Sequence, residues 1–128
     1  MASSASMHGL FNRKMSEFLL DLQQTFKGHR QGPRFAECRA WANLSTKIDE
    51  KQLQRYFDHF VVAPYGQLIK DRNDSFFMEH DFEKEKLEMT LLEDLKSLWT
   101  SMSQENKDAI WNHLNLLLIL NAKCNGDG

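Results

Sequence analysis

The sequence predicts an all-α protein, a compact bundle of five to six helices with a largely buried C-terminal helix. Three observations lead to this prediction. Apolar residues recur every three or four positions over long stretches. No stretch of useful length alternates apolar and polar residues as a strand does, and no internal repeat occurs. With 128 residues, 41% hydrophobic and 27% charged, the chain has the size and composition of one globular domain.

The domain boundaries follow from the composition of the two ends. We expect a flexible N-terminal lead over residues 1–8, a single helical domain over residues 9–124 and a flexible tail over residues 125–128. The lead consists of small and polar residues and lacks the apolar segment of a signal peptide. The tail reads NGDG, a composition that ends helices.

The first predicted helix begins near Leu10 and is expected to end at Gly28 and Gly32. Six of its apolar residues share one face at helical spacing and should be buried. They are Phe11, Met15, Phe18, Leu19, Leu22 and Phe26.

Two further helices are predicted next. Pro33 suits the first turn of the second helix, and Asp49 is expected to cap the third. Pro64 should end or kink the third helix near Val62, with a short helical continuation over residues 65–70. The expected apolar faces consist of Phe35, Cys38, Trp41, Ala42 and Leu44 in the second helix, and Leu53, Tyr56, Phe57, Phe60 and Val61 in the third.

The sequence pattern of the C-terminal half predicts three more helices. Asn73, Asp74 and Ser75 are capping residues before a short helix. A charged passage over residues 79–88 leads into an amphipathic helix, and Ser101 or Ser103 should cap the last one. That last helix is apolar nearly all round, which is typical of the central helix of a bundle. The apolar residues of the amphipathic helix are Leu87, Leu91, Leu95, Leu98, Trp99 and Met102.

The sequence lacks the short motifs of common catalytic and cofactor sites. It contains no P-loop, no GxGxxG, no GxSxG and no HExxH. The densest group of metal-ligating residue types is Glu79-His80-Asp81, but successive residues on a helix point in different directions. We therefore expect no enzymatic activity, no cofactor and no metal site. Cys38 and Cys124 form no CxxC pair and are expected to be reduced thiols, although a single bridge between them stays open.

The charge of the chain is small overall and uneven along its length. The net charge is −2, but residues 1–72 hold eleven Lys and Arg against seven Asp and Glu, or +4, while residues 73–128 hold five against eleven, or −6. This polarity suits either a contact between copies or simply two solvated surfaces of unequal composition. The longest apolar run, residues 116–120, is too short to span a membrane. We expect an intracellular protein, cytoplasmic or nuclear, that does not bind membranes.

A basic cluster around one turn is the first candidate binding site. Its residues lie near the expected start of the second helix, whose terminus adds partial positive charge, and they suit phosphates or an acidic partner. The alternative is a solvated turn. The candidate residues are Lys27, His29, Arg30, Arg34 and Arg39.

Three aromatic residues are a second candidate site. Tyr65, Phe76 and Phe77 would mark a protein interface if exposed, and would otherwise plug one end of the bundle. The segment Leu114–Leu118 matches an LxxLL docking motif, but in so apolar a helix we expect it in the core.

Three segments of the chain carry a resemblance to a known group. They read FNRKMSEFLLDL, FDHFVVAPYGQLIKDRNDSFF and LWTSMSQENKDAIWNHLNLLLIL, with Phe11-Asn12, Pro64-Tyr65 and Trp111 as anchors. Over most of residues 10–124 the chain resembles uncharacterised small all-helical proteins encoded by large double-stranded DNA viruses. The resemblance implies a protein made in an infected cell, either packaged in the virion or acting on host or viral machinery. It supplies no catalytic residues.

These observations favour a non-enzymatic helical protein–protein interaction module, viral in origin, that associates with host or virion proteins. Self-association into a homodimer would fit the large apolar residues and the charge polarity. The alternative is a nucleic-acid-associated protein that uses the basic turn around residues 27–39. The sequence does not identify the protein partner.

Overall fold

The computed structural model describes residues 4–79 and 91–126 of the chain, and these residues form helices and turns without a strand. The predicted all-α bundle is therefore confirmed. Three of the segments, α3, η1 and α4, follow one another without a break as one continuous helix. The elements are α1 (Ser4–Thr25), α2 (Gly32–Ile48), α3 (Gln52–Phe57), the π-helical segment η1 (Asp58–Val62), α4 (Ala63–Lys70), α5 (Ser75–Met78), α6 (Leu91–Trp99) and α7 (Gln104–Cys124).

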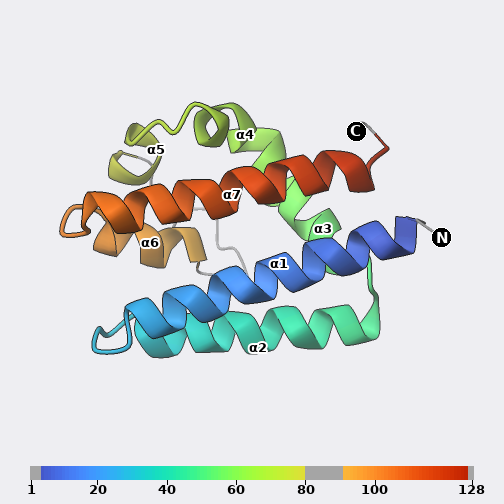
Figure 1. Ribbon diagram of the computed structural model, residues 1–128, viewed down its shortest axis with the longest axis horizontal. Coiled ribbons are helices and arrows are strands. Elements are labelled where there is room, and N and C mark those ends of the chain that lie inside the picture. The colour runs from blue at the N-terminus through green and yellow to red at the C-terminus, as the bar shows by residue number, and fades with distance from the viewer. Residues whose placement is uncertain (1–3, 80–90, 127–128) are drawn as a thin grey trace.

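The helices are arranged around α1 and α7 (Figure 1). Helices α1 and α2 form an antiparallel pair, and α1 also packs along α7. Helix α4 packs on α7, and α5 packs on α6. The two ends of the chain lie at the same end of the bundle (Figure 1).

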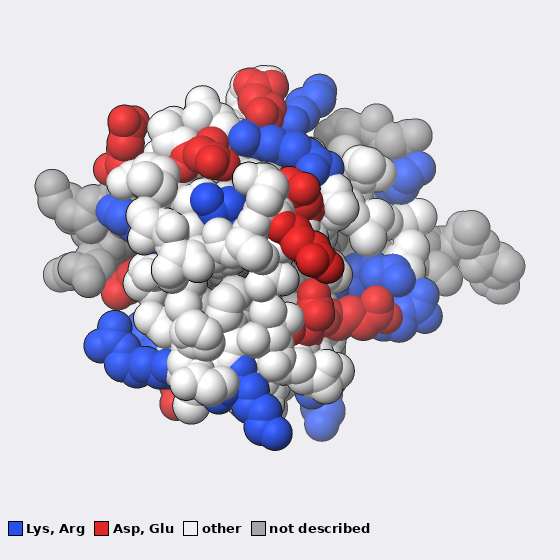
Figure 2. Space-filling model, turned by 60° about the vertical axis from the view of Figure 1, so that its left-hand side comes forward, with Lys and Arg blue, Asp and Glu red and all other residues white. Residues whose placement is uncertain are grey.

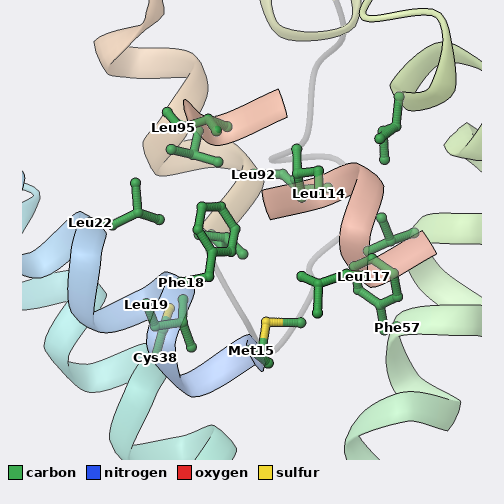
Figure 3. Packing of buried hydrophobic residues seen from close by; sticks show 14 of the residues in the cluster. Met15, Phe18, Leu19, Leu22, Cys38, Phe57, Leu92, Leu95, Leu114 and Leu117 are labelled. Atoms are coloured by element: carbon green, nitrogen blue, oxygen red, sulfur yellow. The ribbon is translucent and has the colours of Figure 1, made fainter. Parts of the chain in front are cut away.

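The apolar stripe of α1 forms the centre of the core, as its spacing predicts. Met15 and Phe18 point toward Leu92 and Leu114 from α6 and α7 (Figure 3). All six predicted members of the stripe are at most 5% exposed. Burial of side chains of this size supplies the main stabilisation of such a bundle.

Helix α1 begins earlier than the sequence indicates. It starts at Ser4, and His8 is 4% exposed, so residues 4–8 belong to the first helix instead of preceding it. The reason is a tertiary contact that local composition does not reveal. His8 Nε2 lies 3.1 Å from Gln54 Oε1 of α3.

Helix α2 begins with Pro33 in its first turn, as predicted. Leu44 was expected on the buried face, but it is 59% exposed. The buried position is taken instead by Ser45, whose Oγ donates a hydrogen bond to Ala42 O at 2.9 Å. Asp49 does not cap α3: its N–H ends α2 on Ser45 O, and its Oδ1 accepts the Lys51 N–H at 2.9 Å.

The continuous helix α3–η1–α4 passes through Pro64, where the sequence predicted an end or a kink. Within η1 the chain makes a wider turn, and the Ala63 N–H donates to Asp58 O, five residues back. The wider turn suits Pro64, which has no N–H and would crowd the Phe60 carbonyl in a regular α-helix. It also keeps one face buried at a constant spacing of four residues. That face consists of Leu53, Phe57, Val61, Tyr65 and Ile69.

The C-terminal helices follow their predicted caps and faces in part. Ser103 caps α7, and its Oγ accepts the Asn106 N–H at 3.1 Å. Helix α7 is buried along one side, which includes Leu114 and Leu117 of the LxxLL segment, so the expectation that this segment is core holds for these two leucines. The opposite side carries Leu116, which is 37% exposed, and Ile119, which is 55% exposed. The predicted passage over residues 79–88 and Leu87 lie almost entirely outside the described residues.

A buried polar network ties the end of α7 to α1 and α3. Gln54 Nε2 donates to Asn121 Oδ1 at 2.8 Å and to Asn125 Oδ1 at 3.0 Å. Asn121 and Asn125 in turn donate to Asp58 Oδ1 at 2.8 and 3.1 Å. Asn125, the first residue of the expected tail, therefore joins this network through its side chain.

Candidate functional site

A group of exposed apolar side chains lies on α2, α3 and η1, and we refer to it as the α2–η1 surface. Leu44, Ile48 and Phe60 are 59%, 74% and 38% exposed, respectively. Trp41 and Tyr56 lie beside them and are half-buried. Single exposed apolar residues are ordinary, but aliphatic and aromatic side chains that share one side of neighbouring helices have the composition of a protein contact.

The spacing of residues along α2 explains why this surface forms. The core face of α2 uses Phe35, Cys38, Ala42 and Ser45. A second stripe runs along its flank through Trp41, Leu44 and Ile48, which are separated by three and four residues. A helix with two apolar stripes can bury one against its own bundle and leaves the other to face outward.

Aromatic contacts hold the centre of the surface in place. The rings of Trp41 and Tyr56 meet edge to face with centroids 5.2 Å apart. Tyr56 packs against Phe60 at 4.7 Å, and Phe60 packs against His59 at 4.6 Å. These contacts connect α2 to η1. Side chains already ordered in this way lose little conformational freedom when a partner binds.

The π-helical turn contributes directly to this surface. The sequence predicted Phe60 on the buried face together with Phe57 and Val61, but the wider turn of η1 leaves Phe60 38% exposed. Single π-helical turns inside α-helices are frequent at functional sites because they redirect a side chain.

Charged side chains stand at the two ends of the α2 stripe. Glu37 lies one helical turn before Trp41, and Lys51 lies in the turn that follows Ile48. Both side chains are exposed. Among the described residues neither makes an ion pair, whereas the nearby Arg55 Nη1 lies 3.5 Å from Asp49 Oδ2.

A narrow apolar cavity lies beneath Tyr56. Its volume is about 20 Å³, and Leu53, Leu92 and Leu114 are among the residues that line it. A cavity of this size holds about one water molecule, and an apolar lining offers such a water no hydrogen bond. The cavity is therefore a packing gap rather than a ligand site.

The basic cluster predicted from the sequence is only partly available for binding. Arg34 Nε lies 2.6 Å from Asp94 Oδ1 of α6, whose side chain is 5% exposed. Arg39 Nε donates to Ser16 Oγ at 3.1 Å and so joins α2 to α1. The remaining candidates, Lys27, His29 and Arg30, are exposed in the turn between α1 and α2.

The side of the molecule that carries the turn between α1 and α2 shows no single continuous basic patch among the described residues. Figure 2 shows the Lys and Arg side chains near its lower edge as separate groups with uncharged atoms between them. A nucleic-acid site normally presents a continuous basic surface that follows the phosphates.

The predicted aromatic interface of Tyr65, Phe76 and Phe77 is wrong. These residues are 8%, 1% and 0% exposed, so they act as the plug that the alternative interpretation described. Phe77 stacks on Trp99 with centroids 4.3 Å apart, and Tyr65 packs against Phe76 at 5.0 Å. An aromatic side chain near a turn is buried whenever the helices on either side fold back over it, and local sequence does not report that.

The sequence does contain a pattern that indicates the α2–η1 surface. Ile48 was assigned no role, and Leu44 was placed in the core. The separations of four, three and four residues from Glu37 through Trp41 and Leu44 to Ile48 are those of a helix that packs on a neighbouring helix. Two overlapping stripes on α2 could have identified the second face.

Some of the His, Asp and Glu side chains in the described residues make contacts within the protein. In residues 4–79 and 91–126, no three His, Cys, Asp or Glu side chains gather in a way that could hold a metal ion. His80 and Asp81 of the sequence cluster lie outside the described residues. His113 Nε2 lies 3.2 Å from Asp21 Oδ2 and its ring stacks on Phe18.

Both cysteines are free thiols. Cys38 is buried in the α2 core face, and Cys124 is partly buried at the end of α7. Burial raises the pKa of the Cys124 thiol, so this thiol stays protonated to higher pH than an exposed cysteine. A reactive, nucleophilic cysteine needs the opposite shift.

No family model matches the sequence, and neither a curated protein nor a solved structure matches it. None of the helices described here combines the length and the apolar composition needed to cross a membrane.

Proposed function

We propose that this protein is a non-enzymatic helical interaction module that binds a protein partner through the α2–η1 surface. The observation that carries the proposal is the exposure of Leu44 and Ile48, 59% and 74%, beside a row of aromatic side chains. Covering these side chains would remove apolar surface from water, which is the dominant favourable contribution to most protein association.

The composition of the surface also favours a protein partner. Trp and Tyr are the residue types most enriched among the side chains that dominate binding energy at protein interfaces. Trp41 and Tyr56 sit at the centre of the surface, with the aliphatic Leu44 and Ile48 on one side and Phe60 on the other. Glu37 and Lys51 provide charged groups at its edge, in the position of a polar rim.

Two other surfaces support an interaction less well. The exposed apolar pair on α7, Leu116 and Ile119, is less exposed than Leu44 and Ile48, at 37% and 55%. In the basic turn, Arg34 and Arg39 are engaged within the protein, which removes two of the five cations that a nucleic-acid site would use. A nucleic-acid function is therefore the weaker alternative.

We also propose that the module acts inside an infected cell. This part rests on the sequence resemblance to small proteins of large double-stranded DNA viruses. A virion component and a host-directed factor would use the same kind of surface, so the surface does not distinguish these two roles.

The test is affinity capture of the tagged protein from the cells that produce it, with nuclease treatment, followed by mass spectrometry. The wild type is compared with Leu44→Asp/Ile48→Asp, and Leu116→Asp/Ile119→Asp is the matched control with two charges on another exposed apolar pair. We expect stoichiometric protein partners, including further copies of the chain, to be lost from the first variant and kept by the control. Equal capture by all three proteins, or partners that vanish with nuclease, would contradict the proposal.

A further inference from the structure

We propose that the occupant of the α2–η1 surface is a second copy of this chain, with the two α2 helices packed antiparallel about a two-fold axis at Leu44. This inference rests on the proposed function and names the partner of the same surface. Closed two-fold dimers are the commonest assemblies of identical chains, and each copy then presents the same residues.

The spacing on α2 is that of a helix–helix contact. Trp41, Leu44 and Ile48 are separated by three and four residues, which keeps them on one line along a partner helix that crosses at a small angle. The stripe lies on the flank of α2, beside α3, and leaves the core face to the bundle. A second α2 can therefore pack on this flank without disturbing the buried face.

The charges at the ends of the stripe favour an antiparallel arrangement of the two α2 helices. Glu37 precedes Leu44 by seven residues and Lys51 follows it by seven. Helix α2 ends at Ile48 and Asp49 is extended, so Lys51 stands in the turn just past the helix. In an antiparallel pair centred on Leu44, we expect the exposed Glu37 side chain of each copy to lie near the turn that carries Lys51 of the other, which gives two opposite-charge pairs. Lys47, exposed in the last turn of α2, adds further positive charge at the same end. Of the acidic side chains at that end, Asp49 Oδ2 lies 3.5 Å from Arg55 Nη1, and Glu50 is exposed in the turn. A parallel pair would instead place Glu37 beside Glu37 and Lys51 beside Lys51, which disfavours it.

The helix dipoles support the same direction. Two antiparallel helices place the positive N-terminal end of one beside the negative C-terminal end of the other. The central position of Leu44 puts this large aliphatic side chain against its own copy. Trp41 and Ile48 lie on either side of the axis, so the aromatic row of each copy borders the aliphatic end of the other.

The size of the contact sets the expected affinity. The most exposed apolar side chains of one copy present on the order of 300 Å² of surface, the size of the largest apolar patch on an ordinary monomer. A contact built on such a patch falls at or below the lower end of stable interfaces. The dimer should accordingly dissociate in the micromolar range and be in exchange with monomers at lower concentration.

The test is sedimentation velocity of the purified full chain over about a hundredfold range of concentration, a range that resolves a micromolar equilibrium. We expect the wild type to rise from one chain to two, and Leu44→Asp/Ile48→Asp to stay at one chain. Glu37→Lys and Lys51→Glu should each weaken the dimer by about three- to tenfold, and the double variant Glu37→Lys/Lys51→Glu should recover most of the loss because the charges pair again. Glu105→Lys, a reversal on α7 away from the surface, should leave the dimer unchanged.

The outcomes separate this inference from the proposed function. A wild type that stays monomeric at every concentration, or charge reversals that do not compensate, would overturn the antiparallel dimer. If the monomeric wild type still loses captured partners on Leu44→Asp/Ile48→Asp, the interaction module stands and its partner is a different protein. If both experiments give no difference, both proposals fail. Circular dichroism of each variant confirms folding, and all the changed side chains are half-buried or exposed.

Discussion

Gln54 donates a hydrogen bond to Asn121 across 2.8 Å, although each of these two residues is only 2% exposed. The bond joins α3 to α7, and the same Gln54 side chain lies 3.1 Å from His8 of α1. Three helices that are far apart in sequence therefore share one buried amide. Such a group fixes the relative positions of the helices because a buried polar atom is costly to leave without a partner.

Gln54→Leu should destabilise the protein by about 2–4 kcal/mol, because His8 and Asn121 would lose a buried hydrogen-bond partner. Chemical denaturation followed by circular dichroism measures the free energy of unfolding. Gln67→Leu is the matched control, since Gln67 is exposed and bonds only to Asp71 one turn away; its effect should stay within about 0.5 kcal/mol. Equal effects of the two substitutions would show that the buried network does not stabilise the fold.

Leu44→Ala should change the free energy of unfolding of the monomer by no more than about 0.5 kcal/mol, whereas Leu53→Ala should cost about 2–4 kcal/mol. The two leucines lie on neighbouring helices, but Leu44 is 59% exposed and Leu53 is 1% exposed. The measurement is denaturation at a protein concentration below the dimer dissociation constant. A large loss for Leu44→Ala would mean that this residue belongs to the core.

The sequence predicts the parts of the fold that depend on local pattern. The stripe from Phe11 to Phe26, Pro33 at the start of α2 and the Ser103 cap of α7 all occur where their patterns indicate. In each case the determining interaction lies within one helix or at its end. Periodicity and capping chemistry report such interactions directly.

The parts that failed depend on contacts between distant segments. The start of α1 at Ser4 is accompanied by the contact of His8 with Gln54, which lies 46 residues away. Phe76 and Phe77 are buried because Trp99 and Trp111 close over Phe77. Leu44 was expected to be buried because it is hydrophobic, but adjacent residues on a helix face different neighbours, and Ser45 takes the buried position. The candidate site was missed for the same reason.

Arg34→Ala should destabilise the protein by about 1–3 kcal/mol, because the buried carboxylate of Asp94 would lose the guanidinium 2.6 Å away. Arg34 is itself 43% exposed, which keeps the effect below that of a fully buried pair. The control is Arg13→Ala, whose partner Glu17 lies 3.9 Å away with both side chains more than half exposed; it should change stability by less than about 0.5 kcal/mol. If Arg34→Ala leaves the free energy of unfolding unchanged, the contact with Asp94 does not hold Arg34 in place. Arg34 is then available for an external ligand, and the basic cluster is again a candidate binding site.

The rate of alkylation of Cys124 should be low near neutral pH. It should still increase with pH in the range where the rate for an exposed cysteine has already become constant. The physical reason is that burial raises the pKa of this thiol, so a smaller fraction is thiolate at any given pH below that value. Iodoacetamide labelling across a pH series, with peptide mass analysis to separate Cys124 from Cys38, measures the rates. The same reaction in denaturant is the control, where the thiol should react like a free cysteine. Equal rates in the folded and unfolded protein would contradict the expected shift.

The most direct test of the central claim is disulfide cross-linking of Leu44→Cys in a Cys124→Ser background, compared with Ile119→Cys in the same background. Both new thiols are exposed, but only residue 44 lies at the proposed two-fold axis, where the two copies approach within reach of a disulfide. We expect mild oxidation to convert Leu44→Cys into a covalent dimer rapidly, and Ile119→Cys to remain largely a single chain. Equal or slower cross-linking at position 44 would contradict the claim that α2 of one copy packs against α2 of another.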